Sequence, residues 1–530
     1  MNISIVKYLA VITVVFLTIN PQVPAADTMG ELGIDLEISA TSLHEWMPSV
    51  TYNPIDNEFV VLWHTTGVRE QGGKVLYSLH GRRYDADGNP VGMPLSPISS
   101  IGPERRILPR AAHNHFNNQY MVAFVMGQDI TEWDPFITIM DHDGGGMYGP
   151  AAISAQLTKA NHTNIAFNSK RRQYLVVYND SRNGNADVFG IILDEAGNIV
   201  KADFAVNASK GEQINAYVCY NPADDTYLVN WEDFRNVSQW RDQGDIYGAL
   251  LDGAGNIAVP DIPMCDDHES TTAGDQRHNN IAYNPDKNEF FVSWTDTRPT
   301  LDNVGIVGRF IRADGTPAGP DFTAADAPES QIFPHAVYVQ KRKQYFMIWD
   351  DSRNDAPGTP WRDAKNRDPY AKWLSDTGGP AGPDIPLAIN DGVQRYSDLA
   401  YNPLMDRFLI AWRDEVNEEV LSEGDPSGGH ITESGGNIMG KIYGMPAFLT
   451  GRVVERQTNS PVDAARVTVM GLGMPRFETA NIGGWFNIPD EDQRQGTYII
   501  MVYKRGYRIG FTTAKFQGEP LKITIELEKR

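Results

Sequence analysis

The chain is poor in cysteine and in positive charge. Only two of its 530 residues are cysteine, Cys219 and Cys265, and neither belongs to a CxxC pattern. This excludes a disulfide framework, thiol redox chemistry and covalently attached haem. Lys and Arg number 46 against 68 Asp and Glu, a formal charge of -22. Because neutralising phosphates requires an accumulated basic surface, we expect no nucleic-acid partner.

Long apolar runs are also scarce. Residues 1–26 hold Lys7, an apolar run over residues 8–19 and a small-residue ending at Ala25 and Ala26, which is the pattern of a secretory signal peptide. The run is shorter than the roughly 20 residues that a membrane-spanning helix needs. We therefore expect an exported protein, secreted, periplasmic or held at the cell surface, without membrane insertion.

One short phrase recurs seven times and sets the expected fold. Its aromatic or His residue, usually followed by Asn, stands at Tyr52, His113, Phe167, Tyr220, Tyr283, Tyr338 and Tyr401. Each copy precedes an alternating strand such as EFVVLW or QYLVVY, and later a Gly-containing turn and further strands. Alternating aromatic and β-branched residues predict strands, and the Asn-Pro stretch predicts a hairpin. Seven units of four antiparallel strands predict an all-β protein with a seven-bladed β-propeller over residues 27–447.

The two ends of this expected ring complement each other. The seventh unit lacks its last strand, and residues 33–39 resemble the last strand of the sixth unit at residues 382–388. We therefore predict that residues 31–40 complete blade seven and remove an unpaired edge. The Asp-x-x-Gly runs at 85–88 and 141–144 lack the later Glu of a calcium loop, so we interpret them as turns.

Residues 448–530 differ from the repeats in pattern and charge. They carry 12 Lys and Arg against 9 Asp and Glu, a charge of +3, whereas residues 27–447 carry 33 against 59, a charge of -26. Short alternating runs separated by Gly and Pro predict a small β-sandwich. Residues Gly451–Val454, Ala465–Val469, Gly484–Ile488 and Gly506–Tyr507 resemble the carboxypeptidase regulatory-like, transthyretin-like domain family. That resemblance implies a structural or surface-adhering accessory domain.

Candidate binding residues lie on one expected face of the propeller. The long loops between the second and third strands of the blades share this face with the segments that lead into the first strands. Trp133, Trp240 and Trp361 lie in these loops, where they would stack on a sugar ring or a partner. The repeated Trp-x-Asp-x-Arg endings of the second strands predict an ion pair between blades or a turn, and Arg235 would still reach this face.

The first strands carry a second signal. Gln213, Gln276, Gln331 and Gln394 repeat seven positions before the aromatic residue, and we expect them to be structural. Three and five positions before it, the side chains differ between units: they include Arg110, His162, Asn164, Asn215, Tyr217, His278, Asn280, His335, Tyr396 and Asp398. Closing a ring does not require such differences, so the His, Tyr and Arg residues are functional candidates, with His335 and Tyr396 assigned to ligand binding.

These residues suit one reaction. Eliminative cleavage of a uronate polysaccharide needs a group to neutralise the carboxylate, a base for the C5 proton and an acid for the leaving oxygen. Tyr217 would be base and acid, His162 or His278 a second proton-transfer group, and Arg235 or Arg110 the partner of the carboxylate. In architecture the chain is similar to the secreted seven-bladed ulvan lyases, a resemblance that implies His, Tyr and Arg on a propeller face.

A metal site is the remaining chemical candidate. Cys265, His268 and His278 combine thiol and imidazole ligands that suit zinc, although their spacing fits no named zinc motif. No other cofactor is indicated. We expect an exported propeller that binds a carbohydrate or a cell-surface partner. The alternatives are a polysaccharide lyase and a subunit of a secreted complex.

Overall fold

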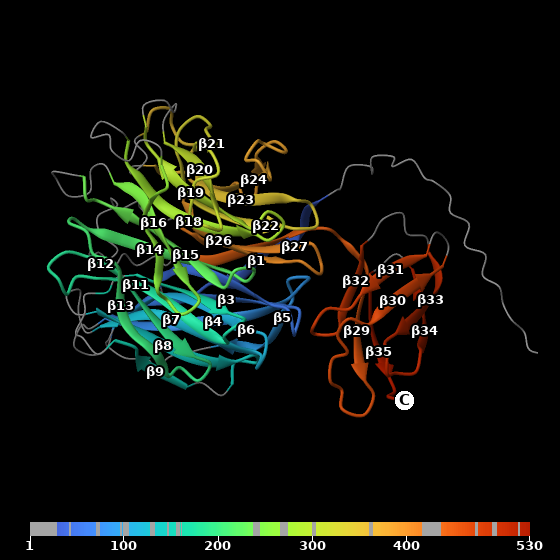
Figure 1. Cartoon of the computed structure of the whole chain (residues 1–530). Helices are drawn as coiled ribbons and strands as arrows, with labels where there is room; N and C mark the ends of the chain where they lie inside the picture. The colour runs from blue at the N-terminus through green and yellow to red at the C-terminus, as the bar shows by residue number, and fades with distance from the viewer. Residues whose placement is uncertain are drawn as a thin grey trace, which may run out of the picture.

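The computed structural model describes residues 29–41, 44–69, 75–95, 98, 105–127, 133–145, 148–154, 160, 162–236, 244–265, 274–298, 304–359, 364–415, 436–471, 475–489, 495–517 and 520–530. These residues form strands and no helix (Figure 1), which confirms the all-β class. Within the described residues, accordingly, no helix offers the length and apolar character that crossing a bilayer demands. The proposed signal peptide lies outside them.

Residues 30–444 form seven four-stranded antiparallel sheets, which we number in chain order. The first strands of the seven sheets are β2 (His44–Asn53), β6 (Arg105–Asn114), β10 (Thr163–Asn168), β14 (Gln213–Asn221), β18 (Gln276–Asn284), β22 (Gln331–Val339) and β26 (Gln394–Asn402). The second strands are β3 (Glu58–Arg69), β7 (Gln119–Gly127), β11 (Gln173–Asp180), β15 (Thr226–Asp233), β19 (Glu289–Asp296), β23 (Gln344–Asp351) and β27 (Arg407–Asp414).

The outer half of each sheet completes the pattern. The third strands are β4 (Val75–Asp85), β8 (Trp133–Asp141), β12 (Asp187–Asp194), β16 (Asp245–Asp252), β20 (Gly305–Arg312), β24 (Asp368–Ser375) and β28 (Asn437–Gly444). The fourth strands are β5 (Pro90–Leu95), β9 (Tyr148–Ala152), β13 (Ile199–Asn207), β17 (Ile257–Pro263), β21 (Phe322–Ala325), β25 (Ile385–Pro386) and, for the seventh sheet, β1 (Gly30–Ser39).

The seven sheets stand in a closed ring. Each first strand contacts the first strand of the next sheet, and β26 of the seventh sheet contacts β2 of the first. The repeated Asn residues strengthen this order, because Asn53, Asn221 and Asn402 each donate a hydrogen bond of 2.9 Å to an Asn in the next sheet. The bond from Asn402 to Asn57 joins the last sheet to the first.

Strand β1 supplies the outer edge of the seventh sheet. It pairs antiparallel with β28, from Gly30 opposite Gly444 to Ser39 opposite Ile438. Its residue Ile38 is only 4% exposed and packs in the apolar cluster between the seventh and first sheets. Lys441 of β28 also forms ion pairs with Glu31 and Asp35 of β1. The edge of β28 is therefore covered by the N-terminal strand, as expected.

The apolar core lies between neighbouring sheets. The second strands are almost wholly buried, and Trp231, Trp294, Trp349 and Trp412 are among the largest fully buried side chains. One cluster joins the third and fourth sheets and another joins the fourth and fifth. Packing on both faces of each sheet explains why these strands are apolar at consecutive positions, rather than alternating as expected from the sequence.

The C-terminal residues form two further sheets. One is β32 (Trp485–Pro489), β29 (Ala447–Glu455) and β35 (Leu521–Leu527); the other is β31 (Arg476–Thr479), β30 (Arg466–Met470), β33 (Gly496–Tyr503) and β34 (Gly510–Phe516). Both contribute to one apolar cluster of buried side chains. The three-stranded sheet meets the ring at the turns that join first to second and third to fourth strands.

The contacts between these two parts are specific. Trp485 Nε1 donates 3.0 Å to the Ile55 carbonyl, and Asn481 Nδ2 donates 3.0 Å to the Pro54 carbonyl. Lys522 lies 2.7 Å from Asp87. The C-terminal sheets therefore lie on the face of the ring that carries the tight hairpin turns, which leaves the opposite, loop-rich face uncovered by them (Figure 1).

Candidate functional site at the axis of the ring

The first strands are irregular where they carry the candidate residues. In six sheets the register between the first and second strands shifts once, which marks a β-bulge. The shift lies within the three residues that lead to Ser49, Arg110, Tyr217, Asn280, His335 and Asp398. The residue five before the repeated aromatic has a positive φ there: Met47, Leu108, Asn215, His278, Phe333 and Tyr396, at 46° to 58°. Such bulges re-aim side chains and occur next to functional sites.

The middle residue of the Trp-x-Asp motif accepts a hydrogen bond from the bulged backbone of the next sheet. Glu232 accepts 2.8 Å from the His278 N–H, and Asp350 accepts 2.7 Å from the Tyr396 N–H. The Phe333 N–H donates 3.2 Å to the Thr295 hydroxyl. Burial raises the pKa of Asp350 to about 6, although Ser397 and the backbone hydrogen bonds act against this. The motif thus fixes the bulge that presents each side chain.

Side chains from five sheets meet at the axis of the ring. Arg110 Nη1 lies 3.7 Å from Asp398 Oδ2, and His335 Nδ1 lies 3.0 Å from Asp398 Oδ1. The Tyr217 ring lies 5.4 Å from the His162 ring and 6.2 Å from the His335 ring, centroid to centroid. Sheets two, four and six are not neighbours, so their side chains meet only across the centre. We call these five residues the axial cluster.

The type of side chain three positions before the repeated aromatic decides whether it bonds to the next sheet. Asn164 accepts 3.3 Å from the Val218 N–H and Asn280 accepts 3.1 Å from the Ala336 N–H, each in the next sheet. Asp398 makes the same bond, 3.0 Å, to the Val50 N–H. At these positions an amide or carboxylate links two sheets. Arg110, Tyr217 and His335 occupy the same position without that bond and point to one another instead.

The cluster combines a neutral imidazole with a fixed positive charge. Burial, and then the charge of Arg110, lower the pKa of His162 to about 3, so its ring is neutral at ordinary pH. Burial acts to lower the pKa of Arg110, but its interactions with Tyr217, which include a hydrogen bond, and with Asp398 hold the pKa above its usual value. The 3.7 Å separation from Asp398 is longer than a hydrogen bond. The guanidinium is therefore held charged beside the Tyr217 hydroxyl.

Half-buried rings form an arc above the cluster, at the loop-side end of the first strands. His278 stacks on Phe333 at 3.8 Å between centroids, Phe333 lies 5.3 Å from Tyr396, and Tyr396 lies 6.3 Å from Trp46. The Arg413 guanidinium lies 3.5 Å from the centre of the Trp46 ring. We call Trp46, His278, Phe333 and Tyr396 the aromatic arc. It spans the fifth, sixth, seventh and first sheets, so His278 belongs to this arc rather than to the axial cluster.

The structure corrects two expectations. Trp133 is 8% exposed and packs in the core between the second and third sheets, so it is not placed to stack on a ligand. Arg235 points along its own sheet, toward the outer strand, and lies 2.7 Å from Asp233 and 2.8 Å from Asp261. Its contact repeats at Arg298 with Asp296 and Asp321. The Arg of the Trp-x-Asp-x-Arg ending therefore forms ion pairs within its own sheet rather than between blades.

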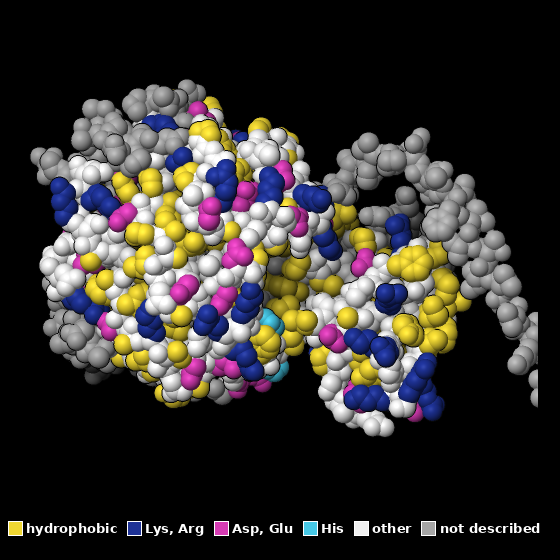
Figure 2. Space-filling model, viewed as in Figure 1, with side chains coloured by type: hydrophobic (Ala, Val, Ile, Leu, Met, Phe, Trp, Pro, Cys, Tyr) yellow, Lys and Arg dark blue, Asp and Glu magenta, His cyan; other side chains and the backbone are white. Residues whose placement is uncertain are grey.

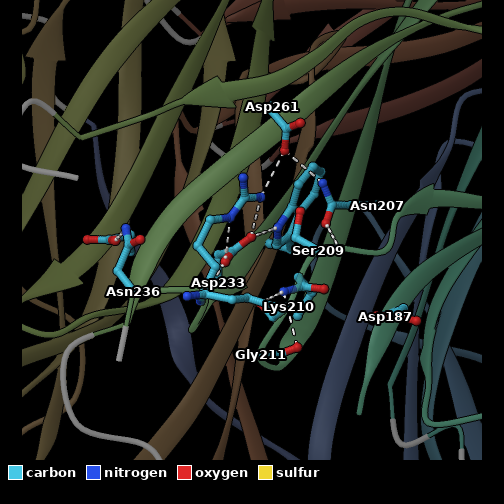
Figure 3. A network of polar contacts seen from close by, with 12 residues as sticks. Asp187, Asn207, Ser209, Lys210, Gly211, Asp233, Asn236 and Asp261 are labelled. Atoms are coloured by element: carbon cyan, nitrogen blue, oxygen red, sulfur yellow. Dashed lines mark hydrogen bonds and ion pairs between the residues drawn. The ribbon is translucent and has the colours of Figure 1, made fainter. Parts of the chain in front are cut away.

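Figure 3 shows the network of polar contacts that includes Asp233, Asp261 and Asn207. Asp261 also accepts 2.8 Å from Asn207 of the neighbouring sheet, so the network around Arg235 is structural on both sides. The repeated Gln residues have a similar role, because the fully buried Gln213 donates 3.2 Å to the Lys210 carbonyl and 3.3 Å to the Gly211 carbonyl. Its N–H donates 2.6 Å to the Ala186 carbonyl of the preceding sheet. These contacts fit the expected structural role of Gln213.

The remaining candidates fall in different places. Trp240, Trp361 and His268 lie outside the described residues. Cys265 is fully buried in the apolar core between the fourth and fifth sheets, whereas His278 lies in the aromatic arc. No group of three His, Cys, Asp or Glu residues in the described part of the chain could hold a metal ion. The zinc hypothesis thus gains no support from the described residues.

A cavity of about 500 Å³ opens at the other end of the axis. The repeated hairpin residues line it, among them Tyr52, His113, Tyr338, Tyr401 and Pro403. The Tyr52 and Tyr401 hydroxyls donate to Asn57 and Asp406, at 3.1 and 2.9 Å. These hydrogen bonds recur with the repeat. The tyrosines at this end of the axis therefore stabilise the hairpin turns. Pro54, which also lines the cavity, accepts from the C-terminal domain, which borders this end.

Three participants were not predicted from the sequence as site residues. Asp398 was noted only by its position, and Trp46 and Phe333 were not singled out. Phe333 shares the position of His278 and Tyr396 in the repeat, so an inspection of every residue at that position, including apolar ones, would have found it. Trp46 lies one position earlier in its own unit and gives no comparable signal.

Known proteins offer little sequence likeness. No family model matches the chain, and no curated protein matches it. Among solved structures, the polysaccharide lyase Uly1 is similar at 9% identity and a TM-score of 0.44, over 75% of this chain and 89% of that one. The Dos1 propeller is similar at 10% identity and a TM-score of 0.37, over 76% and 95%. A PL25 ulvan lyase is similar at 9% identity and a TM-score of 0.38, over 57% and 78%.

Proposed function

We propose that the chain is an exported seven-bladed β-propeller, closed by β1 and followed by a β-sandwich of the carboxypeptidase regulatory-like type. It binds a polysaccharide at the loop-side end of its axis. The ring order of the first strands and the pairing of β1 with β28 support the propeller. The two C-terminal sheets and their shared core support the sandwich.

The observation that carries the binding proposal is the aromatic arc above the axial cluster. Four half-buried rings from four sheets follow one another at centroid distances of 3.8 to 6.3 Å. Aromatic rings stack on the apolar faces of sugars, and the polar groups beneath them would fix the orientation of the hydroxyls. The arc lies on the face that the C-terminal domain leaves uncovered.

A second candidate function, uronate lyase, is favoured by the contacts of Tyr217. This residue reaches Arg110, His162 and His335 at once. β-Elimination needs a base for the C5 proton, and the Tyr217 hydroxyl, which contacts the Arg110 guanidinium, is the group placed to act as that base. Tyr217 would take the C5 proton and return it to the leaving oxygen as the C4–O bond breaks and the C4–C5 double bond forms. Arg110 would neutralise the substrate carboxylate, and His162 would supply a neutral hydrogen-bonding group.

One experiment tests both functions. The mature protein is titrated with a panel of neutral and uronate polysaccharides, while calorimetry measures binding and ultraviolet absorbance follows any unsaturated product. We expect Tyr396→Ala to weaken binding about tenfold, because a lost stacking contact is worth about 1.4 kcal/mol. Tyr148→Ala is the matched control, since Tyr148 is 57% exposed on an outer strand. Equal affinity of Tyr396→Ala and the wild type would contradict the binding site.

The same panel separates binding from catalysis. If the chain is a lyase, Tyr217→Phe abolishes the unsaturated product while binding persists, because the ring remains and only the hydroxyl is lost. Tyr220→Phe is the control on the same strand, since its hydroxyl donates to Asp225 at the hairpin end. Product formed equally by Tyr217→Phe and the wild type would exclude the lyase mechanism. Binding without product across the panel would leave the chain as a binding protein.

A further inference from the structure

The C-terminal domain exposes large apolar side chains on one face of its four-stranded sheet. Phe477 is 72% exposed, Phe511 66%, Ile499 46% and Tyr503 45%. Folding does not account for them, because the opposite face of the same strands supplies Val467, Ile500 and the rest of the sandwich core. In Figure 2 hydrophobic side chains gather on the side of this domain away from the propeller, with Lys and Arg beside them.

The strand register places these residues in rows across the sheet. Phe477 of β31 lies opposite Thr468 of β30, Thr468 opposite Met501 of β33, and Met501 opposite Phe511 of β34. Neighbouring strands lie about 4.8 Å apart, so one row carries a ring at each end about 14 Å apart. The adjacent row pairs Arg466 with Tyr503, and the other pairs Met470 with Ile499. We call this face the outer-sheet platform.

The charges of the outer-sheet platform have one sign. By the alternation of the strands, Arg466 and Lys515 point to the same face as Phe477 and Phe511, and both are exposed. Among the described strands of this sheet, that face presents no acidic side chain. Four threonines, Thr468, Thr479, Thr497 and Thr513, lie between the rings and the charges. The face is therefore hydroxyl-bearing and cationic.

We propose that the outer-sheet platform is a second polysaccharide-binding surface, which takes an acidic polysaccharide laid flat across the strands. The proposal rests on the proposed function for the class of ligand, while the charge of the ligand follows from Arg466 and Lys515. Phe477 and Phe511 stack on sugar rings, threonine hydroxyls bond sugar hydroxyls, and the two cations pair with carboxylates or sulfates.

Two other occupants fit less well. A symmetric pairing of two platforms would bring Arg466 and Lys515 of one copy against those of the other, and like charges across an interface are unfavourable. A lipid surface would need the threonine hydroxyls to lose their water without compensating partners. An acidic glycan satisfies the rings, the hydroxyls and the charges together.

The outer-sheet platform lies on the side of the C-terminal domain away from the ring. The three-stranded sheet of the sandwich contacts the ring through Trp485 and Lys522, so the four-stranded sheet presents its outer face away from it. Two sites on one chain raise the effective concentration of ligand at either one. The platform would therefore hold the protein on a polymer while the loop-side site engages a chain end or segment.

The test uses the full mature protein and an insoluble acidic polysaccharide, such as cross-linked alginate or pectate. We expect the double variant Phe477→Ala with Phe511→Ala to lose retention on the gel at least about tenfold, since two stacking contacts are removed. Its melting temperature should be unchanged because both rings are exposed. Met93→Ala, which removes a side chain 82% exposed on the ring, is the matched control and should bind as the wild type does.

Further measurements distinguish the outcomes. A soluble fragment too short to reach both rings of the outer-sheet platform reports on the loop-side site: the double variant should bind it as the wild type does, whereas Tyr396→Ala should bind it about tenfold more weakly. If the wild type is retained on the gel but does not bind the fragment, the loop-side site fails and the platform stands. Retention of the double variant equal to the wild type overturns the platform. Loss only of binding to phosphatidylglycerol vesicles, or only of self-association in sedimentation velocity, also overturns it.

Discussion

At the scale of single residues, the surroundings of the axial cluster decide its chemistry. His162 and His335 are the same residue type at two positions of the repeat, yet one is buried beside Arg110 and the other is paired with Asp398. The neutral imidazole and the charged guanidinium meet at Tyr217. Tyr217 therefore has a neutral imidazole ring and a cation as neighbours, which is an arrangement suited to proton transfer.

The charge state of His162 predicts a pH effect on stability. Its pKa is about 3 in the folded protein, against an ordinary value of 6.5. Between pH 6.5 and pH 3 the His162 ring is protonated in the unfolded chain but not in the folded protein. The free energy of unfolding therefore falls as the pH falls through this window. The loss for this residue is at most about 1.4 kcal/mol per pH unit.

Urea unfolding from pH 6.5 down to 4.5 measures this effect. The wild type and His162→Gln share every other titrating group, so the difference between their slopes isolates His162. We expect the wild type to lose stability more steeply than the variant over this range. Parallel slopes would show that His162 is not held neutral, and the charge pattern of the axial cluster would then be wrong.

The sequence predicted residue positions better than residue roles. Arg110, His162 and Tyr217 were predicted to act together, and the structure brings them together. Trp133 and Arg235 were misplaced because a Trp in a loop and a Trp buried at the start of a strand have the same local sequence. Whether Arg235 points to the axis or to the outer strand depends on Asp261, which lies 26 residues further along the chain.

At the scale of elements, the bulges were the feature that the sequence concealed. Left-handed backbone favours Gly and Asn, but the bulged positions hold Met47, Leu108, His278, Phe333 and Tyr396 beside one Asn. What stabilises the bulge is a buried partner such as Glu232 or Asp350 in the preceding sheet. Such a contact between sheets cannot be inferred from the alternation of a single strand. The strands themselves and their order followed from the repeat.

Strand β1 offers a sharp test of ring closure. Ile38 is 4% exposed in the cluster that joins the seventh sheet to the first, whereas Ile34 on the same strand is 84% exposed. We expect Ile38→Ala to lower the free energy of unfolding by about 3 kcal/mol. Ile34→Ala should change it by less than about 0.5 kcal/mol. Chemical denaturation of both variants measures the difference, and equal effects would show that β1 does not complete the ring.

At the scale of the whole molecule, charge and topology divide the chain into two parts with different surfaces. Residues 27–447 are strongly acidic, and residues 448–530 carry an excess of positive charge. The C-terminal domain covers part of the hairpin face through Pro54, Ile55 and Asp87, and so leaves the loop-rich face open. The sequence predicted a change of pattern after residue 447, and β29, the first strand of the C-terminal sheets, spans Ala447–Glu455. The sequence offered no means of predicting which face of the ring the second part covers.

The central claim is that a polysaccharide binds at the loop-side end of the axis. Hydrogen exchange of the mature protein, with and without a saturating oligosaccharide from the panel, tests it most directly. We expect slower exchange over residues 44–50, 331–336 and 394–399, which carry three of the four rings of the aromatic arc and, with His335 and Asp398, two of the five residues of the axial cluster. Protection confined to the hairpin turns at 54–57, 115–118 and 403–406 would place the ligand in the cavity at the opposite end and would exclude binding at the loop-side end.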